Sequence, residues 1–241
     1  MPGFFGKIPS HGDFVTRELS RAFIDVWDVW LQGGIAESKT QLGGGWLDVY
    51  LTSPIWRFGL VSGICGASAW AGILMPSVDR VGRYFPLTIA AELPPNVNPL
   101  QLPGPSRGWF EAIEAVALRA LDDDRFDANQ LQAAIAAVGA IAPAAAPAGP
   151  AAQWGQAWSV ALLGGPDDGV AAALAHELVS RHAPRYSVWW TAASDSGAAA
   201  VVAAAELPEA HCFADLLRGV PSAAAEPPAP LAKAAGGGAP S

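Results

Sequence analysis

The chain has 241 residues, of which 51% are hydrophobic, and its 14 lysines and arginines against 22 aspartates and glutamates give a net charge of −8. This length and apolar content suffice for a sizeable core. Glycine, proline or a charge interrupts every apolar run before it is long enough to cross a bilayer, so we expect no membrane insertion. Acidic charge without a basic stripe argues against binding to nucleic acid, which favours a protein partner or a small ligand.

The N-terminal part of the chain predicts a strand, a loop and a long helix. Residues 4–9, FFGKIP, form the expected strand, and the turn-rich segment SHGDF follows it. Ser20 is placed to cap a helix over residues 21–43, which a run of glycines ends. One face of this helix is apolar and bulky at helical spacing, with the side chains Phe23, Trp27, Trp30 and Leu31. The first residues lack the layout of a signal peptide, so we expect a cytoplasmic protein.

The middle of the chain predicts three strands and two helices. A short ambiguous segment, WLDVYL, precedes the three apolar strands, which span residues 55–62, 69–76 and 84–93. Their connections are short enough for antiparallel neighbours. A Pro- and Asn-rich loop follows, and then two helices at 108–121 and 127–139, with Ser106 and Asp127 at their N-cap positions.

The last part of the chain begins with an Ala/Pro-rich bridge over residues 140–153. The elements expected after it are helices at 168–182 and 211–219 and strands at 157–163, 187–193 and 198–207. Residues 220–241 contain almost no large apolar side chain, so we expect a disordered tail. Residues 1–219 are expected to form a single domain.

The order of these elements indicates the fold class. Strands and helices are interleaved, which is typical of α/β proteins. Several predicted strands are apolar throughout, as in AWAGILM, which indicates burial on both faces of the sheet. We therefore expect a central mixed β-sheet with helices on both sides.

No complete catalytic, cofactor or metal motif is present in the sequence. The segment HELVSRH places His176 and His182 six residues apart, whereas a helical zinc pair needs a spacing of four. His11 and Asp13, in the segment HGD, are the one compact acid/base candidate. The favoured interpretation of that segment is a turn in which Asp13 accepts hydrogen bonds from nearby amides. We expect no enzymatic activity, no cofactor and no metal.

The stretch MPSVDRVGRYFPLTI places Asp79, Arg80 and Arg83 between two strands that look buried. Asp79 can pair with Arg80 or Arg83 and so fix the loop, because buried ions are usually paired. In the alternative, Arg80 or Arg83 reaches a partner or an anion, together with Lys7 and Arg57. The sequence does not separate these interpretations.

The helix face with Trp27 and Trp30 also has two interpretations. Aromatic side chains anchor cores far more often than they mark a binding face. Two tryptophans on one helix face would nevertheless suit a partner surface.

Four segments together resemble one family: GFFGKIPSHGDFV at 3–15, WDVWLQ at 27–32, SPIWRFGL at 53–60 and MPSVDRVGRYFPLT at 75–88. They are similar to the TagF family, also called ImpM, of bacterial type VI secretion. The resemblance is strongest over residues 2–92, and the SVWWT segment at 187–191 extends it toward residue 219. The PSVDRVGRYFP block is long and specific, which argues against a chance match.

The resemblance implies a three-layer α/β/α sandwich and a cytoplasmic accessory protein. Family members act as post-translational repressors of type VI secretion and are linked to the forkhead-associated scaffold protein of that system, which is the partner we expect. The family has no established catalytic residues to transfer to this sequence. The alternative function is an uncharacterised enzyme, or a nucleotide- or anion-binding switch, that uses the HGD and VDRVGR loops.

Overall fold

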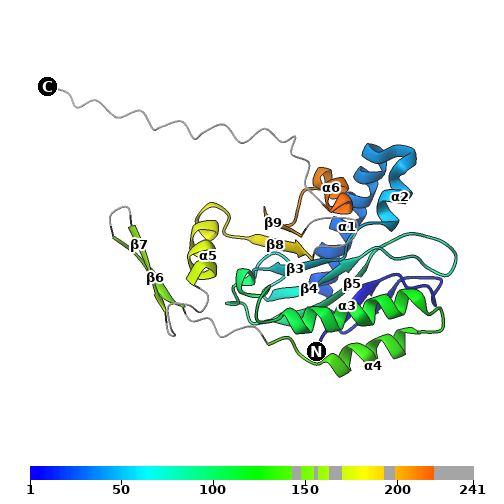
Figure 1. The fold of residues 1–241 in the computed structure, drawn as a ribbon, viewed down its shortest axis with the longest axis horizontal. Helices are drawn as coiled ribbons and strands as arrows, with labels where there is room; N and C mark the ends of the chain where they lie inside the picture. Colours follow the sequence, from blue (N-terminus) through cyan, green and yellow to red (C-terminus); the bar gives the residue numbers. More distant parts are fainter. Residues whose placement is uncertain (143–147, 155–156, 163–169, 193–198, 220–241) are drawn as a thin grey trace.

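A seven-stranded sheet with the strand order β2-β1-β5-β4-β3-β8-β9 organises the chain (Figure 1). The structure is a computed structural model, and it describes residues 1–142, 148–154, 157–162, 170–192 and 199–219. The strands of this sheet are β1 (Gly3–Gly6), β2 (Val15–Arg17), β3 (Trp56–Leu60), β4 (Ala69–Met75), β5 (Leu87–Leu93), β8 (Tyr186–Thr191) and β9 (Ala200–Ala205). A separate hairpin pairs β6 (Ala148–Trp154) with β7 (Ala157–Leu162).

The strand directions correct the expected mixed sheet. Every neighbouring pair in the seven-stranded sheet is antiparallel. The short connections between β3, β4 and β5 permit only this direction. The uninterrupted apolar strands therefore reflect helices on both faces of the sheet and not parallel pairing. The chain thus combines α-helices with an antiparallel sheet.

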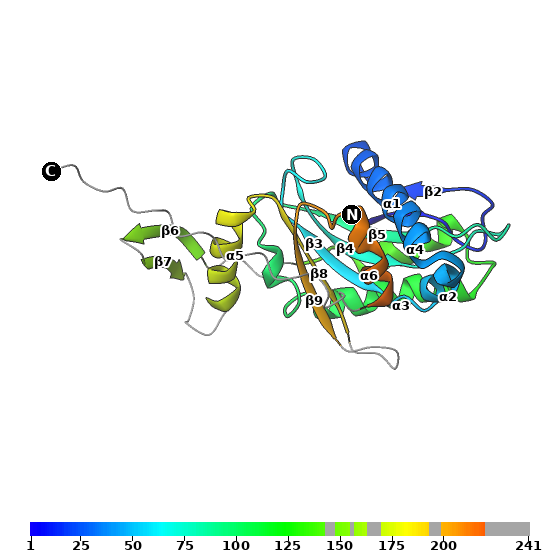
Figure 2. The same cartoon turned by 90° about the horizontal axis from the view of Figure 1, so that it is seen from above.

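Helices cover both faces of the sheet, as Figures 1 and 2 show. On one face lie α1 (Arg21–Leu42), α2 (Trp46–Leu51) and α6 (Phe213–Arg218). On the other face lie α3 (Arg107–Asp122) and α4 (Ala128–Val138). A further helix is α5 (Val170–His182). The side-chain amide of Asn98 donates a hydrogen bond to the Ala172 carbonyl of α5 at 3.1 Å. Each face of the sheet therefore contributes to a core of its own.

The long helix α1 begins and ends where its local sequence specifies. The Ser20 hydroxyl accepts a hydrogen bond from the Phe23 amide at 3.3 Å, which caps the first turn as expected. At the other end Gly43 adopts a φ of 53°, a conformation that glycine takes without a steric penalty. The apolar face of α1 packs on the sheet, where burial of each large side chain contributes about 1.5–3 kcal/mol to the stability of the fold.

Several boundaries differ from the sequence-based expectation. The ambiguous WLDVYL segment is helix α2, and the strand β2 was not expected. Part of the expected Ala/Pro-rich bridge forms strand β6, while residues 143–147 of it lie outside the described residues. Ser106 stands at the N-cap of α3, but its hydroxyl donates to the Ala142 carbonyl and does not cap the helix. Asp127 caps α4 with a complete capping box, as expected.

Two further expectations keep the status of predictions. The tail over residues 220–241 lies outside the described residues. The single domain over residues 1–219 is not tested by the structure. Among the helices of the described residues, none combines the length and the apolar character needed to cross a membrane.

Candidate functional site

Two loops that are far apart in the sequence meet at one end of β1 and β5. The first follows β1 and contains the HGD segment, and the second joins β4 to β5 and contains VDRVGR. The Arg80 amide donates to the His11 carbonyl at 2.9 Å, and the Arg83 guanidinium donates to the Gly12 carbonyl. One backbone and one side-chain hydrogen bond thus join the two loops directly.

Asp79 is the centre of this arrangement, and its side chain is fully buried. One carboxylate oxygen, Oδ2, accepts hydrogen bonds from Lys7 Nζ at 2.8 Å and from Arg83 Nε at 2.7 Å. The other oxygen, Oδ1, accepts from the backbone amides of Val81 at 3.0 Å and Arg83 at 2.8 Å. We refer to Lys7, Asp79 and Arg83 as the Asp79 cluster.

The electrostatics of the cluster keep Asp79 ionised. Burial by itself would raise the pKa of the carboxyl group. The hydrogen bonds from the Lys7 and Arg83 side chains and from the Arg83 and Val81 amides outweigh this effect and hold the pKa of Asp79 well below its usual range. A carboxylate that stays charged and whose oxygens are all occupied by protein donors is a structural anchor and is unsuited to proton transfer.

The loop geometry explains why Asp79 and Gly82 stand at these positions. The Asp79 amide donates to the Arg83 carbonyl at 3.0 Å, and the Gly82 amide donates to the Asp79 carbonyl at 3.0 Å. Gly82 has a φ of 83°, which a residue with a Cβ adopts only at a cost. The aspartate side chain then bonds the amides that the turn leaves free, as short polar side chains do in such turns.

A second set of buried hydrogen bonds, at Ser77, fixes the start of the loop that joins β4 to β5. The Ser77 hydroxyl donates to the Lys7 carbonyl at 2.7 Å. The Tyr50 hydroxyl, on α2, donates to the Ser77 carbonyl at 2.8 Å and accepts from the Ser77 amide at 2.9 Å. Burial raises the pKa of Tyr50, so the phenol stays protonated and keeps its donor role. The base of the loop is therefore held by the Lys7 backbone just after β1, by α2 and by the Asp79 cluster together.

The HGD segment does not form an acid/base pair. The His11 ring contacts the Ser10 hydroxyl at 3.0 Å through Nδ1, and Asp13 accepts from the Phe14 amide at 2.8 Å. The Ser10 hydroxyl in turn donates to the Phe126 carbonyl at 2.9 Å. The segment is a turn in which Asp13 bonds a neighbouring amide, which is the interpretation that the sequence favoured.

Arg57 and Arg80 have different surroundings. The Arg57 guanidinium forms a bidentate pair with Glu114 on α3, with distances of 2.6 and 2.8 Å, and does not join the Asp79 cluster. The hydrogen bond to Glu114 raises the pKa of Arg57. Arg80 is exposed, and within the described part of the chain its guanidinium has no hydrogen bond or ion pair. Of the sequence-predicted arginines, only Arg80 presents an uncompensated charge to solvent.

The tryptophan face of α1 is core. Trp27 is fully buried, and its indole N–H donates to the Thr88 hydroxyl on β5 at 2.8 Å. Trp30 is half-buried, and its indole N–H donates to the Pro208 carbonyl at 2.7 Å. Both rings also contact Trp189, at centroid distances of 5.9 and 5.2 Å. The interpretation of this face as a partner surface is wrong for Trp27, because no part of it reaches solvent.

Comparison with known proteins places this arrangement in a family. Residues 3–138 match the sequence model described as the TagF N-terminal domain, associated with the type VI secretion system. The matched segment is more than half of the chain. The chain belongs to the TagF family. The resemblance seen in the sequence is therefore confirmed, and this TagF chain is a type VI secretion-associated protein.

A solved structure supports the same placement. The TagF chain is similar to the crystal structure of PA0076 from Pseudomonas aeruginosa PAO1, with 35% sequence identity and a TM-score of 0.76. The similarity covers 90% of this chain and 94% of PA0076. No match to a curated protein was found. The Asp79 cluster lies within the segment that matches the TagF N-terminal domain, whereas β8, β9 and α6 lie beyond it.

Two partners in this TagF chain were not expected from the sequence. Lys7 was a candidate for binding an external group, but it neutralises Asp79, 72 residues away. Glu114 was not singled out, although its position four residues after Phe110 puts it on the apolar face of α3, where a carboxylate needs a partner. Within the described segments, no three His, Cys, Asp or Glu side chains gather to hold a metal ion.

Proposed function

We propose that this TagF chain is an accessory regulatory protein that represses type VI secretion after translation, in the cytoplasm, by binding a component of the system. The expected partner is the forkhead-associated scaffold protein. The chain acts through protein–protein contact and not as an enzyme. We also propose that the helices on both faces of the sheet make the three-layer α/β/α sandwich expected for the family.

The observation that carries this proposal is the rigid, exposed tip of the VDRVGR loop. Arg80 is exposed without a partner in the described residues, and the neighbouring Val81 is 65% exposed. The Asp79 cluster fixes the loop beneath them, so little conformational entropy is lost when the tip is bound. An arginine beside an apolar side chain on a fixed loop suits a protein contact.

The second candidate function is an anion- or nucleotide-binding switch at the same place. It is favoured by the contact between the two loops, which brings the Arg80 amide to the His11 carbonyl. The Asp79 cluster argues against it, since Lys7 and Arg83 are already paired with one protein carboxylate. Saturable binding of ATP or inorganic phosphate that Arg80→Ala abolishes would favour the switch over the protein contact.

Affinity co-purification from cells that carry the secretion genes tests the proposed function. Tagged wild-type chain is expected to retain the scaffold protein, and Arg80→Ala is expected to retain at least tenfold less while keeping the wild-type melting temperature. Arg107→Ala is the matched control, because Arg107 is also exposed and, within the described segments, it pairs with Glu111 alone, on the surface. Equal recovery with all three proteins would contradict a contact through Arg80, and no recovery with wild type would contradict the partner.

A further inference from the structure

Within the described residues, the strand β9 lies at one edge of the seven-stranded sheet, and no further strand pairs with it there (Figure 2). The Glu206 amide donates to the Arg185 carbonyl at 2.8 Å, so the residues of β9 that hydrogen-bond to β8 lie at even-numbered positions. The amides and carbonyls of the odd-numbered residues Val201, Ala203 and Ala205 therefore point away from the sheet. Among the described residues, these outward groups have no hydrogen-bond partner.

The two edges of the sheet differ in a way that singles out β9. The opposite edge, β2, has three residues and carries the exposed Thr16 and Arg17. Short length and charge are the usual means by which an edge resists pairing with another strand. β9 has six residues, AVVAAA, with no charge and no proline, and Val201 is 73% exposed. β9 has the features of an edge that accepts a further strand.

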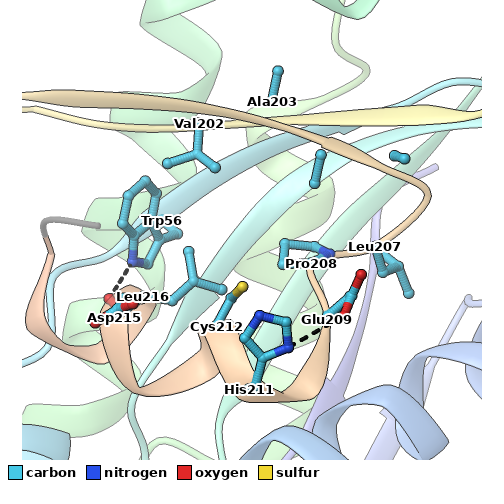
Figure 3. A pocket seen from close by; sticks show the side chains of 12 residues that line it. Trp56, Val202, Ala203, Leu207, Pro208, Glu209, His211, Cys212, Asp215 and Leu216 are labelled. Carbon is cyan, nitrogen blue, oxygen red and sulfur yellow. Dashed lines mark hydrogen bonds and ion pairs between the residues drawn. The ribbon is translucent and has the colours of Figure 1, made fainter. Parts of the chain in front are cut away.

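An apolar groove runs beside this edge (Figure 3). It has a volume of about 360 Å³ and lies between β9 and the segment formed by the short helix η3 (Ala210–Cys212) and α6. We refer to it as the β9 groove, and its lining residues include Trp56, Val202, Pro208, Cys212 and Leu216. The indole N–H of Trp56 is already used, since it donates to the Leu216 carbonyl at 2.8 Å. The groove therefore offers apolar surface to an occupant.

The acidic lining residues of the β9 groove are Glu209 and Asp215, and His211 lies beside them. Glu209 contacts the ring of His211 at 3.2 Å and is 79% exposed, and Asp215 makes a long contact of 3.3 Å with the exposed Arg218. Neither carboxylate is tightly held, so both are available to a cation. The lining is therefore apolar with an excess of negative charge.

We propose that an extended segment of a partner protein adds to β9 as an eighth strand, with its apolar side chains in the β9 groove and a flanking Lys or Arg beside Asp215 or Glu209. Backbone hydrogen bonds to Val201, Ala203 and Ala205 supply affinity, and the groove selects the alternate side chains. The inference deepens the proposed function, on which it rests for the existence of a partner, and it names a second contact remote from the Arg80 loop.

Charge distinguishes this occupant from a second copy of the chain. Two copies joined edge to edge would bring the carboxylates of both grooves into one interface, which electrostatic complementarity disfavours. The β9 side chains that a second copy would offer to the groove are small, mainly alanine, and would leave its volume largely empty. A basic-flanked segment with larger alternate apolar residues meets both requirements.

The test is a titration of the whole chain with the synthetic peptide KTVTVTK, followed by NMR, which detects binding up to millimolar dissociation constants. Its valines and lysines project from the same face, so the valines enter the groove while the lysines meet the carboxylates. Ala203→Pro removes an outward amide without touching the β8 ladder and is expected to weaken binding at least tenfold. Ala203→Thr keeps the amide and is the matched control, with wild-type binding expected.

Two further arms identify the contact. A peptide N-methylated at its valines and one N-methylated at its threonines place the blocked amides on opposite edges, so only one of the two is expected to lose binding. Asp215→Asn is expected to weaken KTVTVTK more than the uncharged peptide QTVTVTQ. Absence of saturable binding, or equal binding by Ala203→Pro, would overturn the inference. The inference would also be overturned if wild type sedimented as a dimer and Ala203→Pro as a monomer, because the occupant of the β9 edge would then be a second copy of the chain.

The experiments distinguish failure of this inference from failure of the proposed function. Peptide binding that depends on Ala203 in a chain that does not repress secretion would uphold the β9 contact and refute the repressor role. If Ala203→Pro loses peptide binding but still represses secretion as strongly as wild type, the assignment of the secretion partner to the β9 edge is overturned.

Discussion

Replacement of Asp79 by asparagine removes the one negative charge of the Asp79 cluster while it keeps the shape of the side chain. Lys7 then holds its ammonium group, 7% exposed, beside a neutral amide. Loss of one partner from a buried pair costs about 3–5 kcal/mol, because the remaining charge is left uncompensated. We expect Asp79→Asn to lose that much free energy of unfolding at neutral pH, a large part of the stability of a typical domain.

The other side of the cluster gives the matched comparison. The Arg83 side chain is 56% exposed, so water screens its pair with Asp79. Arg83→Gln leaves Asp79 with Lys7 and two backbone donors, and we expect a cost of only about 1 kcal/mol. Denaturant unfolding of wild type and both variants, extrapolated to water, measures these differences.

The pH dependence supplies an independent check on the same residue. The pKa of Asp79 is lowered in the folded chain, so its contribution to stability is complete above the unfolded value, which is about 3.9, and is lost as the pH falls below it. The difference in free energy of unfolding between wild type and Asp79→Asn is therefore expected to become smaller in acid. A cost of Asp79→Asn below about 1 kcal/mol at neutral pH would refute the buried-anchor account.

Two other predictions follow from close packing and from burial. A Cβ at Gly34 would overlap the buried Phe213 ring, so Gly34→Ala is expected to destabilise the fold by about 1–3 kcal/mol. A Cβ at Gly33 would meet no atom within 4 Å, so Gly33→Ala is expected to stabilise the fold by up to about 1 kcal/mol. Equal melting temperatures of the two variants would contradict this. Burial lowers the pKa of His176, so stability is expected to fall as the pH drops below about 6.5, and His176→Gln is expected to flatten that profile in thermal melts.

Local signals in the sequence predicted most of the elements correctly. The spacing of large apolar residues and the Ser20 cap predicted α1, and the Asp127 cap predicted α4. These signals lie within one helix turn of the feature that they predict, so no knowledge of the fold is needed to use them. The apolar strands were found for the same reason.

The errors over the strand directions and the β9 groove concern relations between distant segments, whereas the missed strand β6 is a local error. Apolar strands indicated burial on both faces, but helices on both faces produce that pattern with either strand direction, and the mixed sheet was wrong. β6 was not expected, because strands are rarely rich in alanine and proline. The β9 groove combines a strand edge with a helix that follows it in the chain, and edges become visible only when the strand order is known.

In the candidate site, too, the sequence predicted contacts between neighbouring residues but not those between distant segments. The sequence brought Asp79, Arg80 and Arg83 together because they are neighbours in one loop. It did not show that Lys7 is the buried partner of Asp79, since 72 residues separate them. A single lysine next to an apolar strand is the signal that would have suggested it, because a buried ammonium group requires a carboxylate.

The measurement that tests the proposed function most directly is secretion by a bacterium that carries this chain and an active type VI system. The culture supernatant and the cell pellet are assayed for a secreted component, with the chain deleted, at its natural level, or overproduced. The account predicts that overproduction stops secretion while the secreted component and the scaffold protein stay at constant amounts in the cells, as a post-translational repressor requires, and that deletion raises secretion. Unchanged secretion across all three strains, or a fall that follows loss of the component inside the cells, would contradict it.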